Sequence, residues 1–377
     1  MHTTPKVNFK QKTMTYNILT LFFLVVTCLN GYAQKGVFKY IYDEHAKHLD
    51  KILTKHPEDM NFVYTGDFID PITKENKQYE YHLLEYAAYT HQFECVKVIL
   101  KHLSDAQNKQ ETLDQALAEI IQHGSLEMVK LLVDAGADIN YKSEAFHGRS
   151  IIMEAVQYNH IEIFEYLMSF KPSLEGKDKE GRNIFHIAAT HDNDTIIGTL
   201  FEQHQLRDEK DFLGGTPLVY ATYHCSLDNF LKFHEKSDYH VLTEDNEDLV
   251  HFAARNNVDT NVLLYVLSKD SLDINIQDKY GITPIMYAIY NHLYYNNPHT
   301  IRILLREDIN TKIKDEQGLD MLHYAIDTQD LDVVKMVYKK DPSLLDKEHI
   351  KFANHIVAKR SVNRWLHKTY RKAKKTS

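Results

Sequence analysis

The sequence is poor in cysteine and tryptophan and contains no long apolar run. Of its 377 residues only 3 are Cys and 1 is Trp, against 24 Tyr and 23 His. With so few thiols, the fold must be stabilised by packing rather than by disulfides. The longest apolar run, residues 18–29, is too short to span a bilayer core, which needs about 20 residues. We therefore expect no membrane span in the mature chain.

Charge is unevenly distributed along the chain. Residues 1–33 carry three lysines and no acid, and the tail after Ile350 carries nine basic residues and no acid. The other 32 basic residues stand against 53 acidic ones, which leaves the body with a net charge of about −21. Such a body repels phosphate backbones, so we expect no nucleic-acid partner.

The basic tail has two interpretations. Its cations are interleaved with Trp365 and Tyr370, which is compatible with attachment to anionic lipid or nucleic acid. The alternative is a solvated helix that caps the fold and leans on the acidic body. We favour the second interpretation.

Residues 1–33 are typical of an export signal. Basic residues precede the apolar run, and Gly31-Tyr32-Ala33 places small residues before Gln34. We expect cleavage near Ala33–Gln34 and a bacterial periplasmic or secreted protein. A buried helix in this segment, or a lipoprotein anchored through Cys28, are the less favoured alternatives.

Eight segments share one pattern, which is a turn glycine or its substitute, a capping residue, and a helix that begins apolar-x-x-Ala. The spacing is about 33 residues, which indicates supersecondary units that cannot bury their apolar faces alone. Stability must then come from stacking the units in a row. The capping positions are His82, Gln115, Ser150, Asn183, Thr216, Asp248, Thr283 and Asp320.

The repeated pattern resembles the ankyrin repeat, Asp-x-x-Gly-x-Thr-Pro-Leu-His-x-Ala. The clearest unit, residues 278–288, reads Asp-Lys-Tyr-Gly-Ile-Thr-Pro-Ile-Met-Tyr-Ala, and residues 178–188, 211–221 and 315–325 keep part of it. The resemblance covers residues 81–345. It implies an all-α solenoid of helix-turn-helix units with β-turn fingers, about eight repeats in all. Residues 34–80 would cap its N-terminal end, and residues 346–377 would form a C-terminal capping helix and basic tail.

The residue types at each position support the resemblance. Six capping positions carry Ser, Thr, Asn or Asp, whose side chains accept hydrogen bonds from open helix-start amides. Pro217 and Pro284 fall at the first helical position, where the missing N–H is harmless. Two residues before the cap, where a tight turn needs positive φ, five units carry glycine and one carries Asn246. A small alanine five residues after the cap lets the next helix approach closely.

Three units depart from the pattern. Units one and two lack the turn glycine, and unit two carries Ile120 where the others carry alanine, so we expect distorted or shifted boundaries in that region. Unit seven has extra residues at 292–299, which predict a longer turn between its two helices.

No catalytic or cofactor motif is present, and we expect neither an enzyme nor a bound cofactor or metal. His186, His251 and His323 occupy the motif histidine, which in the family ties one repeat to the next. The helix that carries His45 and His48 lacks a third metal ligand. Residues 190–194 fit a solvated turn rather than a calcium loop. Cys95 and Cys225 lie four units apart, too far for a disulfide.

The resemblance also implies a partner surface, because ankyrin arrays bind proteins on the concave face made by fingers and first-helix ends. Tyrosine and arginine are typical binding hot spots. We expect a monomer that binds another protein. A further possibility is pH-tuned binding, because His123, His147, His191 and His224 are among the candidates and histidine changes charge near neutral pH. The alternative is a histidine-dependent metal sensor or enzyme. The candidate residues are Tyr79, Tyr81, Tyr89, His123, Phe146, His147, Arg149, Tyr158, Arg182, His191, Phe212, Tyr223, His224, Arg255, Tyr280, Tyr290 and Asn291.

Overall fold

A computed structural model describes residues 35–69, 76–103, 108–144, 147–203, 208–256, 258–269 and 271–376. The export signal expected at residues 1–33 lies outside these. The chain divides into two compact units. Unit 1 consists of residues up to Ser143 with 150–158 and 165–172, and unit 2 of 144–149, 159–164 and 173–377.

The elements of the first part of the chain are helical except for one long hairpin and two short strands. Strands β1 and β2 pair antiparallel, with Val63 opposite His82 and Ile69 opposite Asn76. This hairpin stands where a short β-turn finger was expected. The elements are α2 (Lys35–Tyr42), α3 (Ala46–Lys55), η2 (Pro57–Asn61), β1 (Val63–Ile69), β2 (Asn76–His82), α4 (Leu83–Tyr89), α5 (Phe93–His102), α6 (Lys109–His123), α7 (Leu126–Asp134), β3 (Lys142–Ser143), β4 (Arg149–Ser150), α8 (Ile151–Gln157) and α9 (Ile161–Met168).

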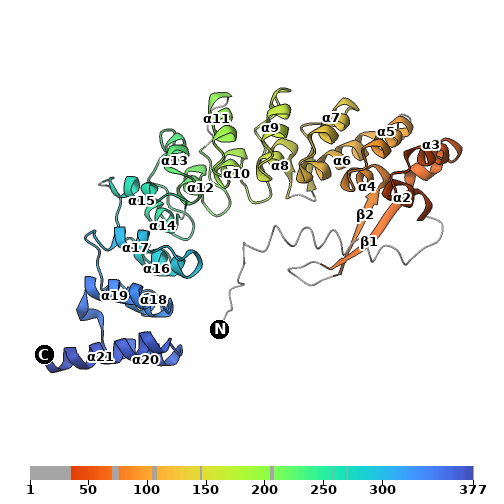
Figure 1. Ribbon diagram of the computed structural model, residues 1–377. Coiled ribbons are helices and arrows are strands. Elements are labelled where there is room, and N and C mark those ends of the chain that lie inside the picture. The colour runs from red at the N-terminus through yellow and green to blue at the C-terminus, as the bar shows by residue number, and fades with distance from the viewer. Residues whose placement is uncertain are drawn as a thin grey trace. The chain divides into compact units, whose positions relative to one another are not determined.

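The rest of the chain is a succession of helix pairs (Figure 1). These are α10 (Ile184–Ala189) and α11 (Asp194–Gln203), α12 (Pro217–His224) and α13 (Leu227–His234), α14 (Leu249–Arg255) and α15 (Thr260–Leu267), α16 (Pro284–Tyr295) and α17 (His299–Leu304), α18 (Met321–Asp327) and α19 (Leu331–Lys340), η5 (Pro342–Leu344), and α20 (Lys347–His355) with α21 (Arg360–Thr376).

Each unit stacks its helices in two rows. In unit 2 the first helices pack in the order α10, α12, α14, α16, α18 and α20, and the second helices α11, α13, α15 and α17 form the other row. In unit 1, α4 packs on α6 and α6 on α8. The alanines five residues after the caps are buried in these contacts, as expected from their small size; they are Ala87, Ala155, Ala188, Ala221, Ala253, Ala288 and Ala325.

The fingers of unit 2 are joined by backbone hydrogen bonds. The N–H of Phe212 donates to the carbonyl of Glu180 at 3.0 Å, and the N–H of Glu316 donates to that of Tyr280 at 2.9 Å. The turn at Gly181 has φ +81°, and a Cβ there would lie 2.8 Å from the Phe212 ring. Glycine is therefore required at this position both by the backbone and by the neighbouring finger.

The expected caps hold at seven of the eight positions, but not all through their side chains. Asn183, Asp248 and Asp320 each accept two backbone N–H bonds. The hydroxyls of Thr216 and Thr283 are buried without a partner. In both threonine units the third helical residue is apolar, so no imidazole is present there to complete the capping box.

The expectation for Gln115 was wrong. Helix α6 starts at Lys109 and has Asn108 as its N-cap, so Gln115 lies in mid-helix. The stretch after Asn108 contains no glycine or proline, and nothing there stops the helix from starting earlier. Ile120 is fully buried, and the shifted boundary expected for this unit is confirmed.

The expected long turn in unit seven was also wrong. Helix α16 runs on to Tyr295, and Asn296 ends it in the left-handed conformation with φ 49°. The extra residues therefore add a turn of helix, because residues 292–295 contain no glycine or proline and asparagine tolerates positive φ.

Candidate protein-binding surface

The candidate residues of unit 1 form a chain of aromatic rings. Tyr81 stacks on Tyr89 with ring centroids 5.5 Å apart. The edge of His123 meets Tyr89 at 5.4 Å, and His91 meets His123 at the same separation. Tyr89 comes from α4 and His123 from the end of α6, so stacking of first helices aligns the rings. The sequence pattern predicted three of these four positions and missed His91.

Helix α4, which carries Tyr89, also carries a buried carboxyl. Glu85 in α4 accepts a hydrogen bond from the N–H of His82 at 3.0 Å. Burial, together with the charge of Glu119 and against the opposing effect of that hydrogen bond, raises the pKa of Glu85 to about 7. Glu119 also lies 3.6 Å from the His123 ring nitrogen. The rings of unit 1 therefore border an electronegative site.

Arg255 is the centre of the candidate surface in unit 2. Its guanidinium lies 4.2 Å from the centroid of Tyr287 and 5.7 Å from that of Tyr223. It also pairs with Glu247 at 2.7 Å. An arginine held by a carboxylate and stacked on rings is pre-organised, so little side-chain entropy would be lost on binding.

The extension of α16 carries the largest exposed aromatic group of unit 2. The hydroxyls of Tyr290 and Tyr294 are hydrogen-bonded at 2.9 Å, and their rings meet edge to face. Tyr294 is 57% exposed and Tyr295 53%. Leu293 is exposed between them. We call Tyr290, Leu293, Tyr294 and Tyr295 the α16 patch. Only Tyr290 was predicted; the signal for the others was the inserted segment of unit seven.

Several finger residues are exposed as predicted. Phe212 is 68% exposed and lies against the preceding finger, and Tyr280 is half exposed. Leu213, beside Phe212, is equally exposed and was not predicted. His147 pairs with Glu180 of the next finger at 3.0 Å and keeps most of its side chain in solvent.

Other candidates lie largely inside the fold and correct the expected surface. Arg149 is buried. Arg182 is held by Asp178 at 2.7 Å and Glu180 at 3.3 Å within its own finger. Asn291 donates to the carbonyl of Arg255 at 3.0 Å and so joins two repeats.

Tyr158 is exposed as expected, whereas His191 and His224 are half-buried. The Tyr158 hydroxyl donates to Gln122 in unit 1, and His191 lies in the turn after α10. Burial, with a smaller contribution from the nearby His191, lowers the pKa of His224 to about 4. His224 therefore stays neutral between pH 5.5 and 8 and cannot tune binding in that range. The side chain of Tyr79 and all of Phe146 lie outside the described residues.

The motif histidines tie repeats together in two of the three expected cases. His186 Nε2 lies 3.1 Å from the carbonyl of Gly215, and His251 Nε2 lies 3.1 Å from that of Ile282. His323 instead packs on His349, with ring centroids 3.9 Å apart. His349 was not predicted as a member of the motif, because its cap, Asp346, follows Asp320 by only 26 residues.

His349 lies between two carboxylates. Its Nε2 is 2.9 Å from Asp320 Oδ1, and its Nδ1 is 2.8 Å from Asp346 Oδ1. Burial alone would lower the pKa of His349, but the hydrogen bonds and charges of Asp320 and Asp346 outweigh it, so that pKa is raised. We call these three residues the His349 clasp. It joins α20 to the cap of α18.

Within the described residues, Asp320, His323 and His349 also form the one group whose ligand atoms could hold a metal ion, all within 4.8 Å of one another. All three are buried. Both histidines already hydrogen-bond the same Asp320 oxygen, at 2.9 Å each. The atoms that could bind a metal are therefore already hydrogen-bonded to one another.

The two described cysteines are poor nucleophiles. Cys95 and Cys225 are not joined by a disulfide, as the sequence predicted, and both are buried. Burial raises the pKa of the Cys95 thiol to about 11 and raises that of Cys225 as well. Both thiols are protonated at neutral pH and cannot act as thiolates. Among the described helices, none combines the length and apolarity needed to cross a bilayer.

Comparison with known proteins agrees with this architecture. Ankyrin repeats (3 copies) match residues 46–143, 84–178, 152–241 and 250–347. An ankyrin repeat and KH domain-containing protein of Caenorhabditis briggsae is 38% identical over 86 residues, 23% of this chain and 3% of that protein. Inversin of Canis lupus familiaris is 25% identical over 212 residues, 55% of this chain and 19% of inversin.

The human transient receptor potential cation channel subfamily A member 1 is 28% identical over 210 residues, 53% of this chain and 18% of the channel. The chain thus spans less than a fifth of the length of each of these three relatives. Ankyrin repeats match residues in both compact units, and together the matches cover well over half of the chain. The chain belongs to the ankyrin repeat family.

Proposed function

We propose that this protein is a non-catalytic scaffold that binds another protein through the α16 patch and the neighbouring Tyr223–Arg255 pair. The observation that carries the proposal is the exposure of Tyr290, Tyr294 and Tyr295 at the C-terminal end of α16. Tyr294 and Tyr295 are more than half in solvent and Tyr290 is 39% exposed, and three exposed tyrosines on one short segment are unusual unless a partner covers them. Tyr295 of the patch interacts with Tyr223, whose ring centroid lies 5.7 Å from the Arg255 guanidinium.

The chemistry of this surface favours a partner that places an apolar side chain among the tyrosine rings and surrounds it with polar groups. Tyrosine buries much area with few rotatable bonds and keeps a hydroxyl for hydrogen bonding. Burial raises the pKa of Tyr223, and contact with Tyr295 contributes, so the phenol stays a hydrogen-bond donor at neutral pH. Tyrosine rings of this kind can therefore contact a partner without gaining or losing a proton.

The test compares two variants of the mature chain. Binding partners are captured from an extract of the source organism and identified, and affinity is then measured by calorimetry. Tyr290→Ala with Tyr294→Ala should weaken binding at least about 100-fold, since a hot spot is worth about 2 kcal/mol or more. Tyr42→Ala, which removes an equally exposed tyrosine of unit 1, is the control. Equal affinity for the double variant and the control refutes the proposed surface.

We also propose that the protein is exported by a bacterium and acts in the periplasm or outside the cell, as an inhibitor, immunity protein or accessory of an exported enzyme. The lysine-flanked apolar run at 18–29 and the small residues before Gln34 support this proposal. Sequencing the N-terminus of the protein recovered from the periplasm or medium tests it. A chain that starts at Met1 and stays in the cytoplasm contradicts export.

The alternative role as a metal sensor depends on Asp320, His323 and His349. It predicts stoichiometric zinc, nickel or copper in the purified protein and a loss of that metal in His323→Gln. Substoichiometric metal would leave the scaffold as the remaining proposal.

A further inference from the structure

Helix α21 presents a continuous cationic stripe. Arg360, Arg364, Lys368, Arg371 and Lys375 follow one another at intervals of three or four residues, and all are exposed. This spacing puts them on one face of the helix over about 22 Å, one cation per turn. We call these five residues the α21 stripe.

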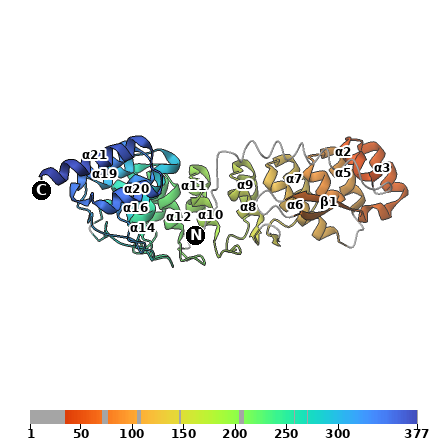
Figure 2. The ribbon, with the colours of Figure 1, turned by 90° about the horizontal axis from the view of Figure 1, so that it is seen from below.

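The opposite face of α21 is already occupied. Val362 and Leu366 are fully buried, and α21 packs on α19 and α20, side by side with them in Figure 2. The ring of Trp365 meets Tyr338 edge to face at 5.2 Å. The apolar side of the helix therefore belongs to the fold, and only its cationic side faces solvent.

The stripe lacks counterions in the part of the chain that the structure describes. None of its five members forms an ion pair there, although acidic residues outnumber basic ones in the whole chain by 53 to 44. The first turn of α21 also contains no acid, so Arg360 and Lys359 stand at the positive end of the helix dipole. A bound anion would reduce the repulsion among these cations and between them and the helix dipole.

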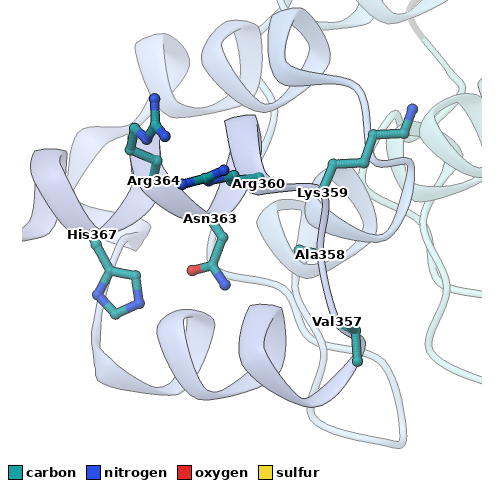
Figure 3. Close-up of a pocket in the computed structure, with 7 residues that line it drawn as sticks. All are labelled: Val357, Ala358, Lys359, Arg360, Asn363, Arg364 and His367. Atoms are coloured by element: carbon teal, nitrogen blue, oxygen red, sulfur yellow. The ribbon is translucent and has the colours of Figure 1, made fainter.

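A hollow at the start of the stripe combines cations with an exposed apolar side chain. Figure 3 shows Lys359, Arg360 and Arg364 around it, with Val357 at its edge. Val357 is 84% exposed and ends α20 with φ 53°. A β-branched residue is disfavoured in that left-handed conformation, where glycine is usual. The fold thus holds an apolar side chain in water at a strained position, next to three cations.

We propose that the α21 stripe, with Val357, docks this protein on the surface of an anionic lipid bilayer, which is the interpretation of the basic tail that the sequence alone did not favour. Four to eight basic residues on an amphipathic helix attract anionic headgroups, each cation adding to the affinity. Val357 would enter the headgroup boundary, as exposed apolar residues of membrane-bound helices do. This inference is independent of the protein-binding surface proposed above.

A single-stranded nucleic acid fits the stripe less well. Such partners require aromatic side chains on which bases stack. The two large aromatics of α21, Trp365 and Tyr370, are half-buried, and Trp365 packs on Tyr338. A long duplex would also extend over the acidic repeats, which repel phosphate. A bilayer needs to contact only this last helix of unit 2.

The experiment is flotation of the full chain with vesicles of phosphatidylcholine alone or with about 30% phosphatidylglycerol. We expect binding only to the anionic vesicles at about 50 mM salt, and its loss at about 500 mM. Arg364→Glu with Arg371→Glu should weaken binding at least about tenfold. Lys236→Glu with Lys314→Glu makes the same charge change at exposed lysines that form no ion pair with a described residue, and should bind like the wild type.

The variant Val357→Asn tests the insertion of Val357 into the bilayer separately from the charge of the α21 stripe. Asparagine tolerates the left-handed conformation, so this variant keeps the fold and should weaken vesicle binding several-fold. Equal binding of the stripe variant and the lysine control, or binding to neutral vesicles, overturns the proposal. Tighter binding to a duplex DNA of about 30 base pairs than to anionic vesicles at the same salt overturns it in favour of nucleic acid.

Discussion

The His349 clasp predicts that the C-terminal end of unit 2 is more stable at pH 6 than at pH 8. Protonated His349 donates to Asp320 and Asp346, and these contacts raise its pKa. A raised pKa means that the stabilisation is fully present below the unfolded-state pKa of about 6.5 and is lost as pH rises through the folded-state value. The pKa of Asp320 is lowered, so its own contribution is lost only in acid and does not interfere.

The magnitude follows from the contacts. His349→Gln removes a buried cation with two charge-assisted hydrogen bonds, each worth about 1.5–3 kcal/mol. Asp346 is more than half exposed, which reduces its share. Asp320 keeps its bonds to His323 and to the α18 backbone. We expect a loss of about 2–3 kcal/mol at pH 6 and a smaller loss at pH 8. In the wild type the slope reaches at most about 1.4 kcal/mol per pH unit.

The assay uses the single tryptophan of the chain. Trp365 lies in α21, which packs on the helix that carries His349. Its fluorescence during urea unfolding therefore reports the C-terminal end, even if the repeats unfold in steps. The wild-type midpoint should fall between pH 6 and 8, and that of His349→Gln should not. His186→Gln is the control and should keep the fall, because burial lowers the pKa of His186 to about 4 and its own contribution to stability therefore rises, rather than falls, with pH. A pH dependence that survives in His349→Gln refutes the reasoning.

Three further predictions concern stability and are measured by urea unfolding. Glu85→Gln should stabilise unit 1 by about 3 kcal/mol at pH 8, since a carboxyl whose pKa is raised from 4.5 to about 7 loses stability once ionised; no gain at pH 8, or an equal gain at pH 4, contradicts this. Thr216→Val should be neutral or stabilising because the buried hydroxyl lacks a partner, and a loss above about 1 kcal/mol would show that the hydroxyl is bonded. Gly181→Ala should cost about 2–3 kcal/mol because its Cβ meets the Phe212 ring, whereas Gly318→Ala, with similar φ but open space, should cost about 1 kcal/mol; equal costs argue against the ring contact.

The two helix boundaries that differed from expectation, in α6 and α16, could not be predicted from the sequence. The start of α6 and the extension of α16 both arise where no glycine or proline interrupts a helix-forming stretch. In such stretches the boundary is decided by which neighbouring helix the side chains pack against, which spacing alone does not reveal. The exposed Tyr294 and Tyr295 follow from that extension, so the α16 patch could be predicted only in part.

The candidate surface shows the same division. Tyr223, Tyr280 and Tyr290 were found from their place in the repeat, and Arg149 was placed beside them by the same rule although it is buried. Position in a repeat predicts which way a backbone segment faces. It does not predict whether a long side chain turns back onto a carboxylate of its own finger, as Arg182 does.

The sequence by itself determined the repeat, the fold family, the turn glycines and most helix starts. Those features are local and recur at a fixed spacing, so each copy confirms the others. Tertiary structure alone decided the His349 clasp, the orphaned threonine hydroxyls and the free cationic side of α21. Each of these depends on which groups meet across neighbouring repeats, and burial then sets the protonation and hydrogen bonding of the groups that meet.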